Sequence, residues 1–337
     1  MTSQLNGFKL ICNTTTTKFK LLSCENWFFQ QIDTFKMTML SQTEALWFLK
    51  YILKVTSVQE KLTNDKAAFL DEIINIYRQK IPFQTITVIS RTDEDQHLSS
   101  MDDIKAQVLS TQGGLCYDHN IFMKHLLEAL GFEVCLNACD IGLNGVRSHV
   151  SVLVKNLVKT GDNYYVDVGT RDPFFQAISL DFDKESPVYK CGFQVYKFVK
   201  ESEEISWWQK VNRSYSTVSL NKKDIIFDGW KKFMTFTLEP REIEYFRDHM
   251  LKHYVTQNPP LPRVTLLQLM RAVAYPGQKL VAILGTTLLH ENDEGKIEKT
   301  KIRSKEELVG LYGKYFPQFP ADLVELAIDK MKYNFEK

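Results

Sequence analysis

The sequence lacks an excess of charge, a long apolar run and a paired set of cysteines. Its 42 lysines and arginines are balanced by 41 acidic residues, for a formal net charge of +1, so no bulk attraction to nucleic acid or to a membrane is expected. The apolar run at 280–284 is too short to cross a bilayer, and the first residues lack the apolar core of a signal peptide. We therefore expect a cytoplasmic protein with no nucleic-acid or membrane partner.

The cysteines are sparse, with six in 337 residues, and none belongs to a Cys-x-x-Cys pair. The common zinc and redox signatures are therefore excluded, and no metal is expected. Scattered thiols without a framework are typical of a reducing compartment, so we expect these cysteines to be reduced.

What the sequence does have is a change of hydrophobic period, which predicts an α+β protein of several subdomains. Residues 1–40 show no clear period and are expected to form a poorly ordered N-terminal extension. From Ser41, whose spacing to Glu44 resembles a capping box, residues 41–131 predict a helical bundle, with one helix over 62–79. Short alternating segments at 133–136, 149–154 and 164–168 predict an antiparallel β-barrel over 132–238. Residues 239–337 mix strand and helix patterns, including a strand over 280–289, and form the last predicted subdomain.

The sharpest local feature is Cys116, which follows Gly113-Gly114 at the start of the clearest predicted helix, 116–130. Glycines allow backbone angles and close approaches that other residues forbid. A thiol at a helix N-terminus feels the positive end of the helix dipole, which favours the nucleophilic thiolate. A small buried core residue is the alternative, and it is the role that we expect for Cys135, Cys139 and Cys191.

His149 begins an apolar strand, and Asp167 lies between valines in the next predicted strand. An acid inside an apolar strand is costly unless it is paired. A hairpin centred near Val158 would place the two residues opposite each other, so that Asp167 orients His149 and His149 deprotonates Cys116. These three residues are the predicted catalytic triad, whereas the histidines within the cysteine helix are expected to be surface or packing groups.

At these residues the sequence resembles the arylamine N-acetyltransferase family. That family carries R-G-G-x-C, then a strand with the catalytic histidine, then V-D-x-G-F-G. The matching segments here are Gln112-Gly113-Gly114-Leu115-Cys116, Ser148-His149-Val150 and Val166-Asp167-Val168-Gly169-Thr170-Arg171. In addition, Ile81-Pro82-Phe83-Gln84-Thr85 stands where the family has P-F-E-N. The resemblance extends in order over roughly residues 45–320.

The resemblance implies the family's fold and reaction. The fold would be a helical bundle with the catalytic cysteine, an antiparallel β-barrel and an α/β lid, around a papain-like Cys-His-Asp core. The reaction would be a ping-pong transfer in which acetyl-CoA, as cosubstrate, acetylates Cys116. An arylamine- or hydrazine-type amine then takes the acetyl group from the thioester. The partners would be coenzyme A and a small-molecule amine acceptor, on a monomeric enzyme.

The resemblance also points to residues around the triad. Coenzyme A would lie between the barrel and the lid, near positive or donor groups at Gly145, Arg147, Ser148 and Arg171. Ordinary solvated surface is the alternative role for the two arginines. The acceptor amine is expected beside residues in or next to the triad motifs, namely Phe83, Tyr117 and Thr170.

The sequence departs from the family at the turn before the thiol and in the acceptor motif. Gln112 replaces the family arginine and Gln84 the family glutamate, two residues thought to pair beside the cysteine. Losing both charges together avoids a buried orphan charge, and a hydrogen bond between the two glutamines is the expected substitute. Thr170-Arg171 replaces an aromatic residue and a glycine, so the acceptor pocket is expected to differ from that of the family.

Two other functions share the order of these residues or the fold. One is a Cys-His-Asp hydrolase or a transglutaminase-like amide exchanger, which would act without coenzyme A. The other is a non-catalytic binding protein that keeps the fold, as the altered residues around an intact triad would allow. Dependence on coenzyme A separates the transferase from the hydrolase.

Overall fold

The computed structural model of the chain describes residues 40–92, 94–142, 149–211, 225–254, 267 and 269–335. All of them belong to one compact unit, Met39–Lys337. Residues 1–39 of the predicted extension lie outside the described residues, so its order stays a prediction. Within the described ranges, no helix combines the length and the apolar character that crossing a membrane requires.

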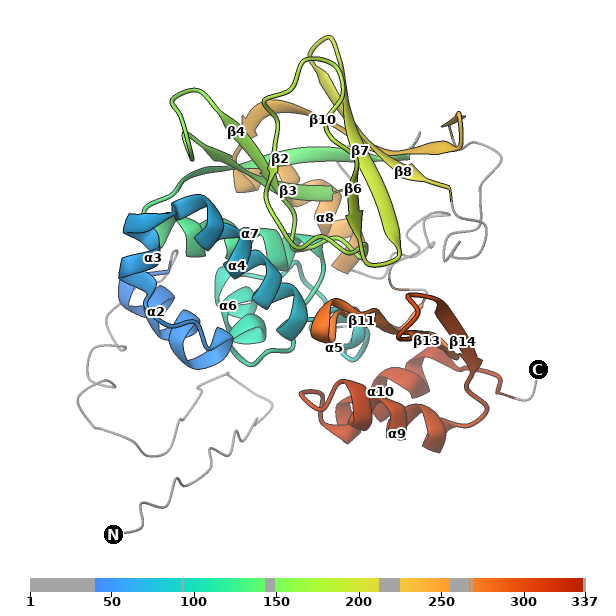
Figure 1. The fold of residues 1–337 in the computed structure, drawn as a ribbon. Helices are drawn as coiled ribbons and strands as arrows, with labels where there is room; N and C mark the ends of the chain where they lie inside the picture. Colours follow the sequence, from blue (N-terminus) through green and yellow to red (C-terminus); the bar gives the residue numbers. More distant parts are fainter. Residues whose placement is uncertain are drawn as a thin grey trace. The chain divides into compact units, whose positions relative to one another are not determined.

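Helices make up the first part of the unit (Figure 1). They are α2 (Gln42–Trp47), the π-helix η2 (Phe48–Leu53), α3 (Val58–Asn64), α4 (Lys66–Lys80), α5 (Ile86–Ile89), α6 (Met101–Leu109) and α7 (Cys116–Ala129). The capping box at α2 is confirmed, because Ser41 Oγ accepts a hydrogen bond from Glu44 N and Glu44 Oε2 accepts one from Ser41 N. The single helix expected over 62–79 is wrong, because Asp65 separates α3 from α4 and caps α4 by accepting a hydrogen bond from Ala68 N (2.8 Å).

Strands follow and form a curled antiparallel sheet in the order β5-β4-β3-β2-β10-β8-β7-β6. They are β2 (Glu133–Ile141), β3 (His149–Lys155), β4 (Asn163–Val166), β5 (Ile178–Ser179), β6 (Tyr189–Cys191), β7 (Gln194–Glu201), β8 (Glu204–Lys210) and β10 (Trp230–Arg241), with β9 (Ile226–Phe227) beside β10. The strands predicted at 133–136, 149–154 and 164–168 correspond to β2, β3 and β4. The predicted barrel is a half-barrel, drawn above α7 in Figure 1.

Aromatic side chains form the core of the half-barrel. The ring of Tyr165 lies 4.7 Å from that of Phe236 and 5.5 Å from that of Phe198, between centroids. Trp207 is fully buried among them. Rings of this size bury a large apolar area, so the sheet is a rigid support for the strand ends that carry His149 and Asp167. Helix α7 packs against β2 and β3.

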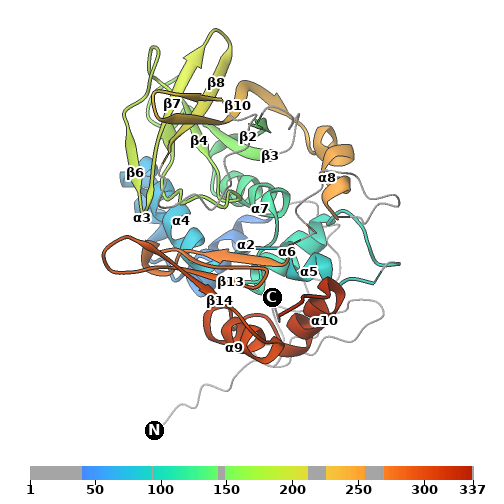
Figure 2. The same ribbon diagram turned by 90° about the vertical axis from the view of Figure 1, so that its right-hand side faces the viewer.

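The C-terminal part contains a second antiparallel sheet, in the order β1-β11-β12-β13-β14. Its strands are β1 (Phe83–Gln84), β11 (Arg271–Ala274), β12 (Val281–Leu284), β13 (Thr287–Glu291) and β14 (Ile297–Lys301). The single strand expected over 280–289 is wrong, because Gly285, with φ of +57°, turns the chain between β12 and β13. Helices α9 (Lys305–Tyr315) and α10 (Ala321–Met331) lie on the side of this sheet away from α7 in both ribbon views (Figure 2).

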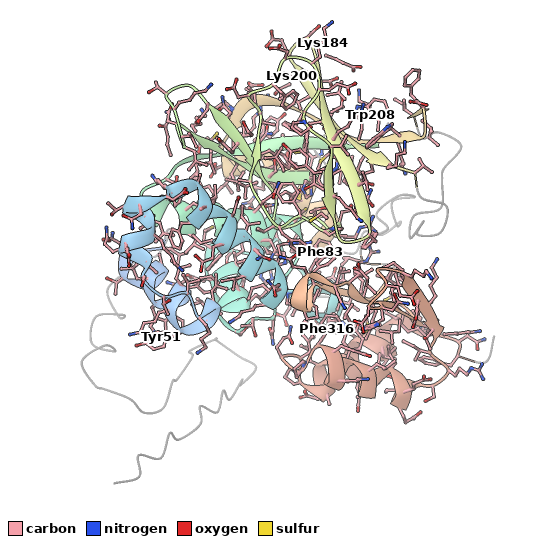
Figure 3. The ribbon with its side chains drawn as sticks, in the orientation of Figure 1. Tyr51, Phe83, Lys184, Lys200, Trp208 and Phe316 are labelled. Atoms are coloured by element: carbon pink, nitrogen blue, oxygen red, sulfur yellow. The ribbon has the colours of Figure 1, made fainter. Side chains whose placement is uncertain are left out.

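Two connections tie this part to the helices and to the half-barrel. β1 lies between helices in the chain but pairs with β11, so Phe83 lies where the helical part and the second sheet meet (Figure 3). The 3₁₀-helix η4 (Ile243–Phe246) and α8 (Arg247–Tyr254) follow β10, and η5 (Pro276–Gln278) joins β11 to β12. The subdomain boundaries expected from the sequence remain predictions.

Candidate active site

Cys116 begins α7 after a turn that requires glycine. Gly113 has φ of +68°, and a Cβ on it would lie 2.1 Å from the carbonyl oxygen of Pro82. The carbonyl oxygen of Gly114 accepts a hydrogen bond from Gln84 N (2.9 Å). The two glycines therefore let the turn lie against β1, which places the thiol in the first position of the helix.

Asp118 caps the start of α7. Its Oδ2 accepts hydrogen bonds from Leu115 N (2.7 Å) and from Tyr254 Oη of α8 (2.6 Å). Burial raises the pKa of Asp118 above its ordinary value, although these hydrogen bonds act in the opposite direction. Through this carboxyl group, α8 is linked to the helix start two residues from Cys116.

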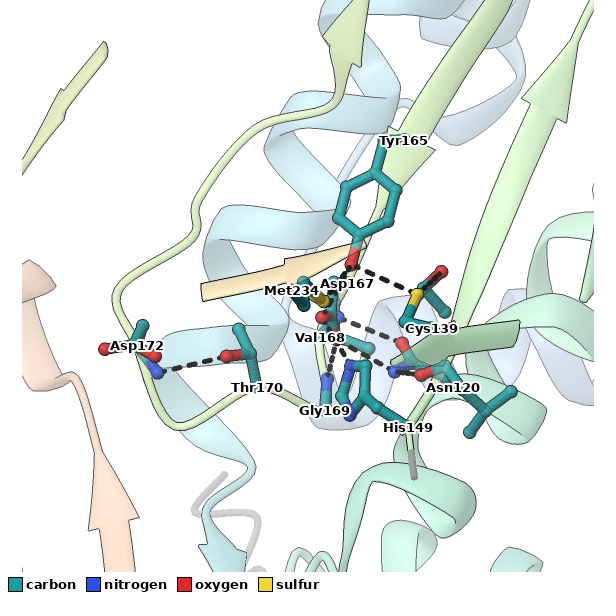
Figure 4. A network of polar contacts seen from close by, with 12 residues as sticks. Asn120, Cys139, His149, Tyr165, Asp167, Val168, Gly169, Thr170, Asp172 and Met234 are labelled. Carbon is teal, nitrogen blue, oxygen red and sulfur yellow. Dashed lines mark hydrogen bonds and ion pairs between the residues drawn. The ribbon is translucent and has the colours of Figure 1, made fainter. Parts of the chain in front are cut away.

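His149 and Asp167 form a buried pair beside this helix start (Figure 4). Nε2 of His149 lies 2.6 Å from Oδ2 of Asp167, and the two side chains are 4% and 0% exposed. The expected register is wrong by two residues, because Lys155 pairs with Asn163 instead of Gly161 and the hairpin is therefore centred at 159 instead of 158. The two residues are diagonal neighbours instead of direct ones, and they still share a face because side chains alternate with a period of two.

Both oxygens of the Asp167 carboxylate are hydrogen-bonded (Figure 4). Oδ2 accepts from Tyr165 Oη (3.1 Å) as well as from His149, and Oδ1 accepts from Asn120 Nδ2 (2.9 Å) and Gly169 N (3.0 Å). Burial alone would raise the pKa of Asp167, but the charge and hydrogen bond of His149, together with Asn120, lower it below its ordinary value. The carboxylate is therefore held ionised and in one orientation.

The thiol of Cys116 lies beside the ring of His149 and acts on the pKa of that ring. Nε2 of the ring is bonded to Asp167. Burial alone would lower the pKa of His149, but Asp167 and Cys116 raise it well above its ordinary value. Gly169 keeps the loop after Asp167 close, since a Cβ there would lie 2.7 Å from Cys116 Cα. The three predicted residues thus lie together.

Two residues that hold the pair were not anticipated. Asn120 lies one turn after Cys116, donates to Val150 O (2.6 Å) and accepts from Val168 N (3.0 Å). Its spacing of four from the cysteine was the available signal, because residues four apart share a helix face. Tyr165 lies two positions before Asp167 and so on the same face of its strand.

His119 of α7 is fully buried and packs against the glycine turn, as one of the two expected roles requires. Its Nδ1 lies 2.9 Å from Tyr77 Oη, and its Nε2 lies 3.1 Å from Pro82 O and 3.2 Å from Gly114 N. Burial lowers the pKa of His119 to about 3, so the ring is neutral. This histidine therefore joins α4 to the turn that carries the thiol.

Gln84 makes different contacts from the expected hydrogen bond to Gln112. Its Nε2 donates to Thr87 Oγ1 (2.8 Å) and to Gly113 O (3.2 Å), and its Oε1 accepts from Thr87 N (3.0 Å). The amide group therefore supports the start of α5 and the glycine turn.

The residues expected to meet the acceptor belong to the segments that build this site. Phe83 and Tyr117 are each 4% exposed; the ring of Phe83 stacks on that of His119 at 6.4 Å, and the ring of Tyr117 lies edge-on to Tyr254 at 6.2 Å. Thr170 is buried, and its Oγ1 accepts a hydrogen bond from Asp172 N (3.2 Å; Figure 4).

Of the residues expected to meet coenzyme A, Arg171 is the one that the structure describes. Its carbonyl oxygen accepts a hydrogen bond from Tyr275 Oη. Its positive charge acts to lower the pKa values of Asp172 and Arg271. The other three, Gly145, Arg147 and Ser148, lie outside the described residues. No cluster of His, Cys, Asp or Glu in the described part of the chain is arranged to hold a metal ion.

The family model and the similar sequences agree on one family. A family model described as N-acetyltransferase matches residues 67–318. Arylamine N-acetyltransferase 1 of Felis catus is 23% identical over 185 residues, which are 52% of this chain and 69% of that protein. The pineal gland isozyme NAT-3 of Gallus gallus is 26% identical over 188 residues, 53% of this chain and 62% of that protein. Arylamine N-acetyltransferase 1 of Homo sapiens is 24% identical, and the chain likewise spans only 62% of its length.

Comparison with solved structures concerns the fold. The Mycobacterium marinum arylamine N-acetyltransferase in complex with CoA has a TM-score of 0.66 at 16% identity, covering 85% of this chain and 98% of that one. The Salmonella typhimurium enzyme has a TM-score of 0.62 at 14% identity, covering 86% and 99%. At these identities the likeness confirms the predicted α+β class, with mixed helices and a curled antiparallel half-barrel.

Proposed function

The chain belongs to the arylamine N-acetyltransferase family, a family of acyltransferases, and we propose that it transfers an acetyl group from acetyl-CoA to an arylamine- or hydrazine-type amine. The observation that carries the proposal is the thiol of Cys116 at a helix start beside His149, which pairs with Asp167 at 2.6 Å. A thiol beside an oriented histidine is a suitable nucleophile for acyl transfer. Cys116, His149 and Asp167 are accordingly the proposed catalytic triad.

In the first step the sulfur of Cys116 attacks the thioester carbonyl carbon of acetyl-CoA. His149 holds the thiol proton as an imidazolium ion, which Asp167 stabilises. A bond forms between the carbonyl carbon and Cys116, the bond to the coenzyme A sulfur breaks, and the departing thiolate takes the proton from His149. The enzyme then carries an acetyl thioester.

In the second step the nitrogen of the acceptor amine attacks the thioester. Neutral His149 accepts a proton from the attacking nitrogen. A carbon–nitrogen bond forms, the carbon–sulfur bond breaks, and Cys116 leaves as the thiolate beside the imidazolium ion. Asp167 keeps Nε2 of His149 protonated, so that Nδ1 faces the reacting atoms in both steps.

We place the phosphates of coenzyme A near Gly145, Arg147, Ser148 and Arg171, as the family resemblance implies. The guanidinium group of Arg171 supports this choice, because guanidinium pairs well with phosphate. The Mycobacterium marinum relative in complex with CoA supports coenzyme A as the partner of the first step. The lid role of residues 239–337, the monomeric state and the cytoplasmic location remain predictions from the sequence.

Release of coenzyme A tests the proposal. Without amine, one equivalent per chain should be released in a burst, and turnover should then stop because the acetyl group stays on the enzyme. Added amine should restore continuous release. Continuous release without amine would instead indicate a hydrolase, amide exchange without acetyl-CoA would indicate a transglutaminase-like activity, and the absence of any reaction would favour a binding protein.

Thr170 gives a separate prediction about the acceptor. A phenylalanine there would offer a larger apolar surface to a plain arylamine, whereas threonine offers a hydroxyl and Arg171 adds a positive charge. We expect the wild type to prefer a carboxylate-bearing aniline to plain aniline. Thr170→Phe should shift the ratio of kcat/KM values toward plain aniline by roughly tenfold.

The matched control is Thr170→Val, which removes the hydroxyl that accepts from Asp172 N (3.2 Å) without adding a ring. Thr170→Val should leave the preference nearer to that of the wild type. If Thr170→Phe leaves the preference between the two amines unchanged, the position does not line the acceptor pocket.

A further inference from the structure

A buried cation that takes no part in the two chemical steps lies beside the triad. Arg78 is in the last turn of α4 and is 2% exposed. Its Nη1 donates to Val168 O (2.9 Å) and its Nη2 to Asp172 O (2.8 Å). Burying a guanidinium group is costly unless its surroundings compensate for lost water, so a buried arginine whose hydrogen-bond partners in the described part of the chain are two carbonyl groups calls for an explanation.

The two carbonyl groups that Arg78 binds bracket the loop that follows Asp167. Within this loop Val168 N donates to Asn120 Oδ1 (3.0 Å), so α4 and α7 hold the two sides of the same residue. Gly169, the next residue, is the one whose Cβ would lie 2.7 Å from Cys116 Cα. The clamp made by Arg78 therefore sets how closely the loop approaches the thiol.

Tyr275 completes the clamp from the end of β11. The guanidinium carbon of Arg78 lies 5.0 Å from the centre of the Tyr275 ring, a cation–π distance. Tyr275 Oη donates to Arg171 O in the same loop. Elements from three parts of the unit, α4, α7 and β11, thus meet at residues 168–172.

Arg78 also completes the balance of charge. In the reactive form of the triad, the thiolate, the imidazolium ion and the carboxylate of Asp167 sum to one negative charge. The positive charge of the guanidinium group brings the sum of these buried charges to zero, and an uncompensated buried charge is energetically costly. Against the effect of burial, His149, Asn120 and Arg78 together lower the pKa of Asp167.

The titratable groups that face Arg78 come from every element around it. They are Tyr77 of α4, His119 of α7, Asp167 and Asp172 of the loop after β4, Cys191 of β6 and Tyr275 after β11. His119 has its pKa lowered to about 3, mainly by burial, and is neutral, while burial raises the pKa values of Tyr77, Asp172, Cys191 and Tyr275. Asp167 and Asp172 are the two carboxyl groups on which the charge of Arg78 acts, and it acts to lower the pKa of both.

We propose that Arg78 is a positioning residue for acetyl transfer: it fixes the loop 168–172 against Cys116, and its charge favours the thiolate–imidazolium form of the triad. The role given to Arg78 rests on the proposed function, but its test measures only the reactivity of the Cys116 thiol.

The test is the rate of Cys116 alkylation by iodoacetamide as a function of pH, with the modified peptide identified by mass spectrometry. In Arg78→Met we expect alkylation at neutral pH to be slower by on the order of tenfold, with the midpoint of the acid limb moved up by about one pH unit, as loss of a nearby positive charge predicts. Arg78→Lys keeps the charge but cannot bridge both carbonyl groups, so the midpoint should stay near that of the wild type while turnover falls.

Lys80→Met is the matched control, since Lys80 is in the same last turn but its Nζ donates to Ile52 O (2.8 Å), in the helical part. It should leave the profile unchanged. An unshifted midpoint in folded Arg78→Met, an equal shift in Lys80→Met, or a full shift in Arg78→Lys would each overturn the proposal. Should Arg78→Met fail to fold by circular dichroism, Arg78→Gln removes the charge while keeping a donor and should show the same shift.

The two proposals fail separately. A wild-type protein that never releases coenzyme A would remove the proposed function while leaving the alkylation result readable. A normal coenzyme A burst with an unshifted Arg78→Met profile would remove the role of Arg78 alone.

Discussion

Cys116→Ala and His149→Ala are each expected to abolish acetyl transfer while the protein still folds. The first removes the atom that carries the acetyl group, and the second removes the group that takes and returns the proton. Each should lower kcat by on the order of 10⁴- to 10⁶-fold, and the double variant should be no worse than either single one, because such residues act as a unit. Initial rates of coenzyme A release with a saturating amine measure the effect.

Cys139→Ala is the control for the first of these variants. Cys139 is paired with His149 across β2 and β3, its sulfur lies 3.2 Å from Ser151 Oγ, and burial raises its pKa to about 12. It is therefore next to the histidine but unsuited to act as the nucleophile. Turnover that survives in Cys116→Ala, or that disappears in folded Cys139→Ala, would show that the thiol has been assigned wrongly.

Asp167→Asn is expected to have the second largest effect, a loss of about 10⁴-fold in kcat by analogy with the aspartate of serine-protease triads. The amide cannot stabilise the imidazolium ion at 2.6 Å from Nε2. Because Asp167 is a main cause of the raised pKa of His149, that pKa should fall in the variant. The thiolate–imidazolium pair would then exist over a narrower pH range, which the alkylation profile of Cys116 would record.

Tyr165→Phe serves as the comparison for Asp167→Asn. It removes one hydrogen bond (3.1 Å) to the same carboxylate and leaves those from His149, Asn120 and Gly169. One hydrogen bond to a charged group is worth about 1.5–3 kcal/mol, so its effect on kcat should be far smaller. A nearly normal rate in folded Asp167→Asn would contradict the role given to this acid.

The features that the sequence predicted well depend on residues close together in the chain. The helix over 116–130 ends at Ala129 in the structure, and Gly131 has φ of +80° as a helix-ending glycine does. The start at Cys116 follows from the glycine pair, which local backbone sterics require. The face shared by His149 and Asp167 follows from strand parity, so it held although the pairing moved by two residues, because an even shift leaves each side chain on the same face.

The features that could not be predicted depend on contacts between distant segments. Nothing near Arg78 in the sequence indicates that its guanidinium group binds the carbonyl groups of Val168 and Asp172, 90 and 94 residues away. The pairing of β1 with β11 likewise joins Phe83 to Val273. Gln84 was expected to bond Gln112, but the turn geometry presents Gly113 O and Thr87 to its amide group instead. Except for the contact of Gln84 with Thr87, which is three residues away, these contacts join segments far apart in the chain, and the local sequence pattern does not indicate them.

The central claim is that the acetyl group passes through the sulfur of Cys116, and the mass of the intact protein after incubation with acetyl-CoA tests it most directly. A single added acetyl group is predicted, located by peptide mapping on Cys116 and removed when an acceptor amine is added. Folded protein that consumes acetyl-CoA while Cys116 stays unmodified, or that carries the acetyl group on another residue, would contradict the account.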